Sequence, residues 1–293
     1  MRRPLSPGAY AIVMATGIVS IAVASAGRPV LSDVLFSLAV AAYVVLPFGV
    51  APVRQPSLFA FTAAGDVLAA RTAAEGWEGV ALGLWALDAL AWIGFAVWLL
   101  RRGSSRREAR GEWLLAVVAT ESLALVAGSL SQRGALPGAH LLGLALFALG
   151  VALYPVVVVL LAPRIGRLVR RHEPLAGDDW ILLGALAISA LAAEHVGVPH
   201  ALAVALWAAA LAWAPALVAG ELARFPSAHD PRRWSTVFPL GMVAVASYAV
   251  GVPSVGVVAT WIAMAAWVAT VLATAATARA GALRRVVSRK TSA

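Results

Sequence analysis

The chain has 293 residues, of which 61% are hydrophobic and 13% are charged, and its formal net charge is +9. Soluble domains are roughly half apolar and about a quarter charged, so this composition excludes an ordinary soluble protein and indicates a membrane protein. The basic residues form short clusters between apolar segments, which is typical of membrane orientation signals and not of nucleic-acid binding. The absence of cysteine excludes disulfides, thiolate zinc sites and cysteine-held iron–sulfur clusters.

Ten apolar segments of the chain are each close to the roughly 20 residues that cross the hydrocarbon core of a bilayer. The third is the least apolar, because it contains Asp66 and Arg71. We predict an all-α integral membrane domain of ten transmembrane helices over residues 1–278, followed by a basic cytoplasmic tail over 279–293. The segments are 8–26, 32–52, 58–76, 79–100, 112–131, 139–161, 180–198, 200–220, 235–252 and 254–277.

The distribution of positive charge predicts the orientation. With both termini in the cytoplasm, all but three of the 23 Lys and Arg residues fall on the inner side, the exceptions being Arg28, Arg71 and Arg133. We therefore predict a multi-pass protein of the cell inner (plasma) membrane. The first segment also resembles a secretory signal that ends in Ala24-Ser25-Ala26, but its cleavage would place the later Arg clusters on the wrong side, so we expect it to be retained.

The odd-numbered segments share two features. Three of them open with a charge and an interfacial tryptophan, at Glu112-Trp113, Asp179-Trp180 and Arg233-Trp234. They also hold most of the polar groups inside the membrane, which normally face a bundle interior or a water-filled path. We predict five helical hairpins, with the odd segments around a centre and the even segments facing lipid. The polar groups are Thr16, Ser20, Asp66, Arg71, Thr120, Glu121, Ser189, Glu194, Thr236 and Ser247.

The ninth segment contains Pro239, which has no N–H, so the Ser235 carbonyl loses its usual helical partner and a kink is favoured. In lipid such a break is tolerated where neighbouring groups or water satisfy the carbonyl, which suits an inner helix. Ser235, Phe238, Gly241 and Val245 lie within about 60° of one line on a helix. Phe238 can project from this stripe into a narrow lumen, or it can fill space between helices.

Two stretches carry a resemblance to a known family: Pro7-Gly8-Ala9-Tyr10 through Met14-Ala15-Thr16-Gly17 and Ser20, and Trp234 through Met242. They resemble the tellurite-resistance/dicarboxylate transporter family, which includes the fungal malic acid and sulfite transporters and the plant guard-cell slow anion channels. The similarity continues through Phe59–Arg71, Trp113–Ser122 and Trp180–Ser189. Ala15 stands where the family usually has glycine.

The resemblance implies ten helices arranged as five hairpins around a quasi-fivefold central pore, an anionic substrate and often a homotrimer. The substrates are small inorganic or carboxylate anions: C4-dicarboxylates, sulfite, tellurite, halides or nitrate. It also implies a pore-occluding phenylalanine on the ninth helix, which matches Phe238 beside Pro239. The remaining pore-lining candidates are Thr16, Gly17, Ser20, Asp66, Arg71, Glu121, Ser122, Ser189, Ser235 and Gly241.

The charged residues leave alternatives open. Arg71 either extends to the membrane surface or draws anions into an outer vestibule. Ionised carboxylates at Asp66 and Glu121 would repel an anion, so a conducting pore needs them protonated, paired or turned away. Such groups can also act as proton relays. We interpret Asp88 and Glu194 as structural.

The search for other chemistry indicates neither an enzyme nor a cofactor. His140, Glu194, His195 and His200 lack helical metal-ligand spacing, and the chain contains no P-loop and no GxSxG motif. The glycine pairs Gly79/Gly83 and Gly143/Gly150 predict close helix packing.

Two functions remain. The first is an anion pathway constricted by Phe238, and the second is a proton-coupled transporter that uses Asp66 or Glu121. The second would suit two inverted five-helix halves. The observed similarity, however, is among odd segments of one orientation, which favours the first.

Overall fold

The computed structural model describes residues 6–50, 56–102, 110–171, 173, 175–223 and 230–290. Within these residues the chain forms ten α-helices and no strand, as predicted for an all-α protein. Eight helical segments are long and apolar enough to cross a membrane; α9 is a shorter apolar helix, and α3 carries Asp66 and Arg71. The helices are α1 (Ala11–Ser25), α2 (Pro29–Val45), α3 (Phe59–Ala74), α4 (Glu78–Arg102), α5 (Leu115–Gln132), α6 (Ala139–Arg171), α7 (Ile181–Val196), α8 (His200–Ala223), α9 (Trp234–Ala249) and α10 (Pro253–Lys290).

The predicted spans agree with these helices to within a few residues, except at the ends of α2, α6 and α10. Helix α2 ends at Val45, and the predicted end at residue 52 lies outside the described residues. Helices α6 and α10 continue about ten residues past the predicted ends, to Arg171 and Lys290. The predictions stopped where the apolar composition stopped, but Ala, Leu and Arg are strong helix formers in water as well. The predicted tail therefore begins inside α10, and its last residues, 291–293, lie outside the described residues.

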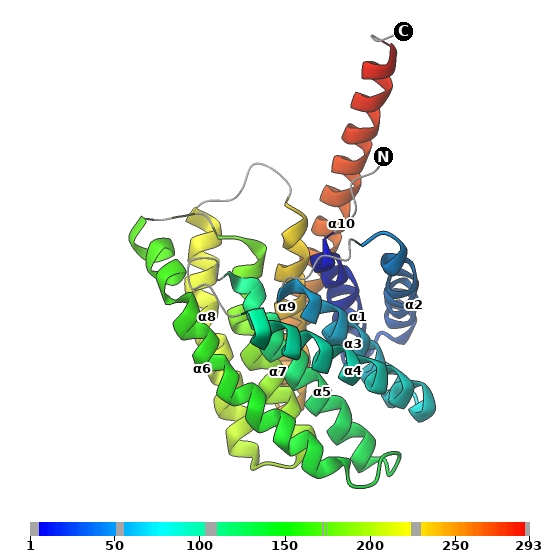
Figure 1. Ribbon diagram of the computed structural model, residues 1–293, viewed down its shortest axis with the longest axis vertical. Coiled ribbons are helices and arrows are strands. Elements are labelled where there is room, and N and C mark those ends of the chain that lie inside the picture. Colours follow the sequence, from blue (N-terminus) through cyan, green and yellow to red (C-terminus); the bar gives the residue numbers. More distant parts are fainter. Residues whose placement is uncertain are drawn as a thin grey trace.

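The odd-numbered helices form an inner ring. Each hairpin partner packs on its neighbour in sequence, and in addition α1 contacts α3, α3 contacts α5, α5 contacts α7, α7 contacts α9, and α9 returns to α1. Figure 1 shows these five helices in the middle of the molecule, with α2, α4, α6 and α8 around them and α10 extending beyond the bundle. This packing follows the predicted division into odd inner and even outer helices.

Burial separates the two sets of helices. In an 18-residue apolar stretch of each of the spans Gly8–Ser25, Gly111–Gln132 and Gly177–Val196, 67%, 83% and 89% of the residues are buried. In the corresponding stretches of the five even helices only 17% to 22% are buried. The exposed residues of the even helices are large and apolar, such as Leu90, Val159 and Leu272, which is the surface that lipid requires.

Aromatic side chains tie four of the outer helices to the next inner helix of the ring. Inside a low-dielectric bundle an indole or phenol donor needs an acceptor, and four even helices supply such a donor in the same relation. This repetition joins neighbouring hairpins around the ring. The bonds are Trp92 Nε1 to Thr120 Oγ1 (2.9 Å), Tyr154 Oη to the Leu182 carbonyl (3.1 Å), Trp207 Nε1 to Ser247 Oγ (2.9 Å) and Trp267 Nε1 to Thr16 Oγ1 (3.0 Å).

A short 3-10 turn precedes each inner helix. These turns pack on one another in succession, so the five inner helices all begin at one end of the bundle. In Figure 1 this is the end from which α10 extends. The turns are η1 (Pro7–Tyr10), η3 (Pro56–Leu58), η4 (Gly111–Leu114), η5 (Gly177–Trp180) and η6 (Pro231–Arg233).

The glycine pairs behave differently from one another. A Cβ added at Gly143 would lie 3.3 Å from the Ala124 carbonyl oxygen, and one added at Gly150 would lie 2.5 Å from Glu121 Oε1, so this pair packs closely as predicted. The prediction for Gly79 and Gly83 was wrong, because a Cβ at either position would meet nothing within 4 Å. Both lie on the outward part of α4, where spacing alone does not reveal whether a partner helix is present.

Candidate functional site at the inner ring

Phe238 lies on the face of α9 that points into the ring. Its neighbour Pro239 packs on α7, where a Cβ at Gly184 would lie 2.9 Å from Pro239 Cγ. Gly241 packs on α1, where its own Cβ would lie 2.6 Å from Ile18 Cγ2. Successive residues of an α-helix are roughly 100° apart around the helix axis. Phe238 therefore lies between Pro239 and Gly241 around that axis, on the side of α9 opposite the half-buried Leu240. Only 1% of Phe238 is exposed, so the surrounding helices enclose it.

Gly17 and Gly241 both mark close contacts between inner helices. A Cβ at Gly17 would lie 2.6 Å from Val67 Cγ1 of α3, as one at Gly241 would from Ile18 of α1. These glycines therefore allow α1 to approach α3 on one side and α9 on the other. Ser235, at the start of α9, is half-buried.

Two further candidates, Thr16 and Ser20, are hydrogen-bonded to outer helices. Thr16 accepts the bond from Trp267 of α10. Ser20 Oγ donates to the Ser32 carbonyl of α2 at 2.9 Å, and Ser32 Oγ donates back to the Ser20 carbonyl at 2.9 Å. The Thr16 hydroxyl therefore links α1 to α10, and the Ser20 hydroxyl links α1 to α2.

Four of the candidate residues are brought together in pairs. Ser122 of α5 donates a 2.7 Å hydrogen bond to Asp66 Oδ2 of α3, and Ser189 of α7 donates a 3.0 Å bond to Glu121 Oε1 of α5. All four are at most 1% exposed. The sequence suggested each residue singly; the structure makes them two acid–serine links that join α3 to α5 and α5 to α7.

Arg71 is held between α2 and α3. It forms ion pairs with Asp33 (3.1 Å) and with Glu75, and its guanidinium lies 5.9 Å from the centre of the Phe36 ring. Two carboxylates therefore compensate its charge. Near the same end of the bundle, His200 Nδ1 is 2.6 Å from Glu194 Oε1; within the described residues no three His, Asp or Glu side chains are grouped to hold a metal ion.

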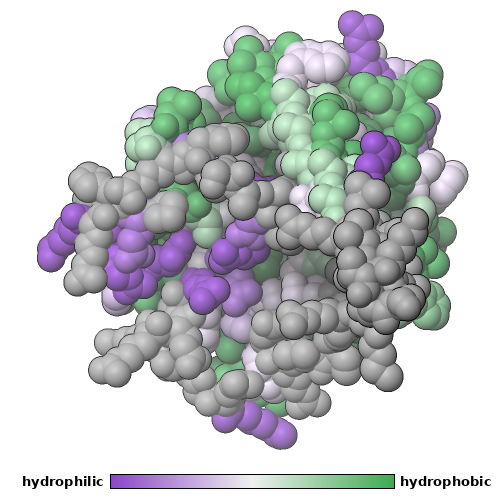
Figure 2. All heavy atoms as spheres, turned by 90° about the horizontal axis from the view of Figure 1, so that it is seen from above, coloured by the Kyte–Doolittle hydropathy of each residue, from purple (hydrophilic) through white to green (hydrophobic). Residues whose placement is uncertain are grey.

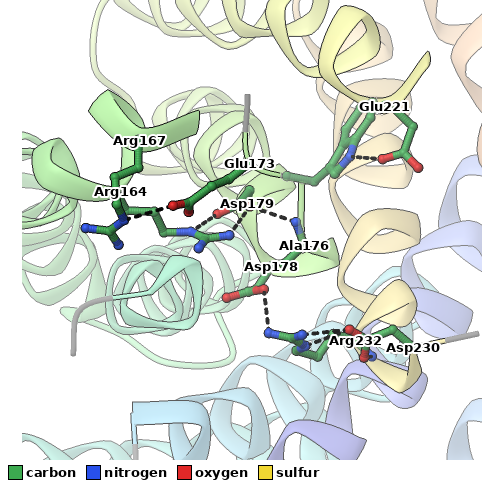
Figure 3. A network of polar contacts seen from close by, with 10 residues as sticks. Arg164, Arg167, Glu173, Ala176, Asp178, Asp179, Glu221, Asp230 and Arg232 are labelled. Atoms are coloured by element: carbon green, nitrogen blue, oxygen red, sulfur yellow. Dashed lines mark hydrogen bonds and ion pairs between the residues drawn. The ribbon is translucent and has the colours of Figure 1, made fainter. Parts of the chain in front are cut away.

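Hydrophilic side chains gather at the end where the inner helices begin. Figure 2 looks onto this end and shows hydrophilic residues in its left and central parts, with apolar residues gathered toward the top and right. Figure 3 shows the ion pairs among them, which connect α6, α8 and the turns η5 and η6. They are Arg164 with Asp179 (2.6 and 2.5 Å), Arg167 with Glu173 (3.6 Å), Arg232 with Asp178 (3.8 Å) and Asp230 (2.7 Å), and Arg233 with Glu221.

Asp230 and Arg232 form the part of this network that lies outside the membrane spans. Partial burial acts to raise the pKa of Asp230, but hydrogen bonds from the Arg232 side chain and backbone bring that pKa below its usual value. The same hydrogen bond raises the pKa of Arg232. Both groups are therefore charged at neutral pH, as an ion pair requires.

Glycines within the 3-10 turns were missed in the sequence. A Cβ at Gly111 would lie 2.9 Å from the Asp179 nitrogen, and one at Gly177 would lie 2.6 Å from the Arg232 carbonyl carbon. Each turn therefore rests on the backbone of the next. The sequence feature that could have revealed them is a glycine placed one residue before Glu112-Trp113 and two residues before Asp179-Trp180.

Comparison with known proteins places the chain among membrane proteins. Residues 4–278 match the family SLAC1, voltage-dependent anion channel. Two similar proteins are uncharacterized membrane proteins of Mycobacterium tuberculosis, from strains CDC 1551 and H37Rv. Each is 31% identical over 146 residues, which cover 41% of this chain and 74% of the relative.

Proposed function

Because the chain belongs to the SLAC1 family of voltage-dependent anion channels, as its motifs indicated, we propose that it carries small anions along a path through the ring of α1, α3, α5, α7 and α9. It is a multi-pass membrane protein. The anions in question are C4-dicarboxylates, sulfite, tellurite, halides or nitrate. The protein acts as a channel or transporter and not as an enzyme, in the plasma membrane, with both termini in the cytoplasm and three copies in the assembly.

The position of Phe238 carries this proposal. The residue lies on α9 between the contacts of that helix with α1 and α7 and is 1% exposed, and from this position its side chain would project into the ring. A bulky apolar side chain at the centre of a narrow path excludes water and ions, which is one recognised way to close a pore. Phe238 is then the constriction, and Pro239 fixes the position of α9 against Gly184.

The direction of the inner helices supports an anionic substrate. All five begin at the same end of the bundle, where their 3-10 turns meet. A helix N-terminus carries a partial charge of roughly +0.5, so one mouth of the ring collects five such charges. This arrangement favours anions over cations at that mouth.

A proton-coupled transporter is the alternative, and the acid–serine links are the observation in its favour. Asp66 and Glu121 are fully buried, and Asp66 Oδ1 and Glu121 Oε2 have no hydrogen-bond partner among the described residues. In a coupled transporter these carboxyl groups would exchange protons as the anion moves.

The test is anion flux into liposomes that contain the purified protein, measured with a panel of the anions named above. The variant Phe238→Ala removes the constriction. Phe147→Ala is its matched control, because Phe147 is a similarly buried phenylalanine (4% exposed) on the outer helix α6. Truncating either phenylalanine costs roughly 3–5 kcal/mol by soluble-core precedent, so flux is expressed per folded molecule.

We expect Phe238→Ala to raise flux several-fold for at least one anion, while Phe147→Ala leaves flux per folded molecule near that of the wild type. If Phe238→Ala lowers stability without raising flux, the residue only fills space and the constriction is refuted. If no anion on the panel enters wild-type or variant liposomes, the anion pathway itself is refuted.

A further inference from the structure

A second cluster of polar groups lies between the inner and outer helices, where α2, α3, α4 and α5 meet. Its centre is the pair Asp66 of α3 and Asp88 of α4, which are 1% and 0% exposed. Ser122 of α5 donates a hydrogen bond to Asp66 Oδ2 (2.7 Å), and Tyr43 of α2 donates one to Asp88 Oδ1 (3.4 Å). Asp88, which we interpreted from the sequence as structural, therefore lies close to a second buried acid.

One oxygen of each carboxyl group in this cluster has no partner. Asp66 Oδ1 and Asp88 Oδ2 are buried and accept no hydrogen bond from any described residue, and the Thr62 hydroxyl one turn before Asp66 is also unpartnered. A buried polar atom without a partner is costly and calls for an explanation. Burial without a hydrogen-bond donor disfavours the charged form of a carboxyl group and so favours its protonated form.

Gly65 sets the two carboxyl groups side by side. A Cβ at this position would lie 2.6 Å from the Asp88 carboxyl carbon, so the Asp88 carboxyl rests on the α3 backbone next to Asp66. Only a residue without a side chain permits this approach. Gly65 therefore brings a carboxyl group of an outer helix to a carboxyl group of an inner helix.

Among the described residues, no Arg or Lys forms an ion pair with Asp66 or Asp88. From α2 the facing group is the Tyr43 hydroxyl, and α1 carries no charged residue. On α5, Glu121 is bonded instead to Ser189 of α7. On α3 itself, Arg71 is paired with Asp33 and Glu75.

We propose that Asp66 and Asp88 form a binding site for one proton. Two adjacent carboxylates cannot both ionise in a dry site without a cation, so the pair holds one proton between them. Taking up the proton from water forms one O–H bond on a carboxylate oxygen and removes one negative charge, and losing it returns the proton to water. The proton belongs to the pair and not to either residue alone.

Occupancy of this site acts on the wall of the ring. Asp66 is bonded to Ser122 across the α3–α5 contact, and the Asp88 carboxyl group reaches α3 at Gly65 from the outer helix α4. A second negative charge on the pair drives α4 away from α3 or draws water between them, and either movement displaces the Asp66–Ser122 link. Anion flux then depends on pH with the steepness of a single proton, at most about tenfold per pH unit. This second step rests on the proposed function; the proton site does not.

The site is tested directly by infrared spectroscopy of the purified protein, which detects the carbonyl stretch of protonated carboxyl groups. We expect wild-type protein at neutral pH to show a protonated-carboxyl signal that is lowered or shifted in Asp66→Asn and in Asp88→Asn, while any contribution of the buried Glu121 remains. Asp33→Asn, which changes an exposed carboxylate (68% side-chain exposure) on the adjacent α2, keeps the signal. The two single variants are independent, so misfolding of one leaves the other as a test. A signal that persists unchanged in the folded Asp66→Asn/Asp88→Asn double variant overturns the proposal.

Flux measurements on the same proteins test the second step. We expect the pH dependence of wild-type flux to become flat in Asp88→Asn and to persist in Asp33→Asn. An unchanged pH profile in Asp88→Asn overturns the link between the site and the ring. If the infrared signal behaves as expected but no protein carries any anion, the proton site stands and the proposed anion pathway fails.

Discussion

Gly177→Ala is the change for which the geometry gives the clearest expected effect. Gly177 begins the turn η5, and its Cβ would lie 2.6 Å from the Arg232 carbonyl carbon of η6. Ordinary contact begins at 3.4 Å. The two turns must therefore part by at least 3.4 − 2.6 = 0.8 Å. Both partners are backbone, so no side chain can turn aside to absorb the displacement.

The displacement strains the packing of successive turns and lengthens the Arg232–Asp178 contact, which already spans 3.8 Å. Forcing an extra methyl group into well-packed structure costs about 1–3 kcal/mol. At roughly 2–4 °C per kcal/mol, the apparent melting temperature should fall by several degrees. The effect should be clear in thermal unfolding of the detergent-solubilised protein, followed by tryptophan fluorescence.

Gly94→Ala is the matched control. Gly94 lies on the outer helix α4, and a Cβ there would meet nothing within 4 Å. The same methyl group should therefore leave the melting temperature unchanged or raise it slightly, because alanine favours a helix over glycine. Equal melting temperatures for Gly177→Ala and Gly94→Ala would refute the argument that the turns rest on one another.

Two further predictions concern the hairpins and their assembly. Trp267→Phe and Thr16→Val should each lower the free energy of unfolding by about 0.5–1.5 kcal/mol. The double variant should lose less stability than the two single losses added together, because both changes remove the same hydrogen bond. Additive losses would show that the bond contributes nothing. The purified protein, weighed by light scattering with the detergent contribution subtracted, should have three times the mass of one chain, and a monomer mass would contradict the homotrimer.

The sequence by itself determined the class of fold, because a protein whose solvent is lipid needs long apolar segments, and these are visible in the composition. A helix that crosses hydrocarbon must be apolar over about 20 residues, and seven of the predicted spans end within a few residues of the observed helices. Polar groups such as Thr16, Asp66 and Glu121 cannot face lipid, so their concentration on odd segments also indicated which helices lie inside.

The sequence did not determine where helices end in water. Hydropathy marks only the part of a helix that meets lipid, so the continuations of α6 to Arg171 and of α10 to Lys290 were missed. The outward-facing Gly79 and Gly83 were misinterpreted for a related reason. The spacing of glycines along the sequence indicates where a helix surface is flat, but it does not indicate whether another helix packs there.

Tertiary structure alone decided which polar residues meet. Asp66 and Ser122 are 56 residues apart, and Glu121 and Ser189 are 68 apart, so no local period could pair them. The place of Asp88 beside Asp66 depends on Gly65 in a different helix, and the direction of Phe238 follows from what its neighbours Pro239 and Gly241 touch. A hydrogen bond or a close contact needs two groups held at a fixed distance and angle. The helices that carry these groups reach that geometry only when the inner helices have packed into the ring.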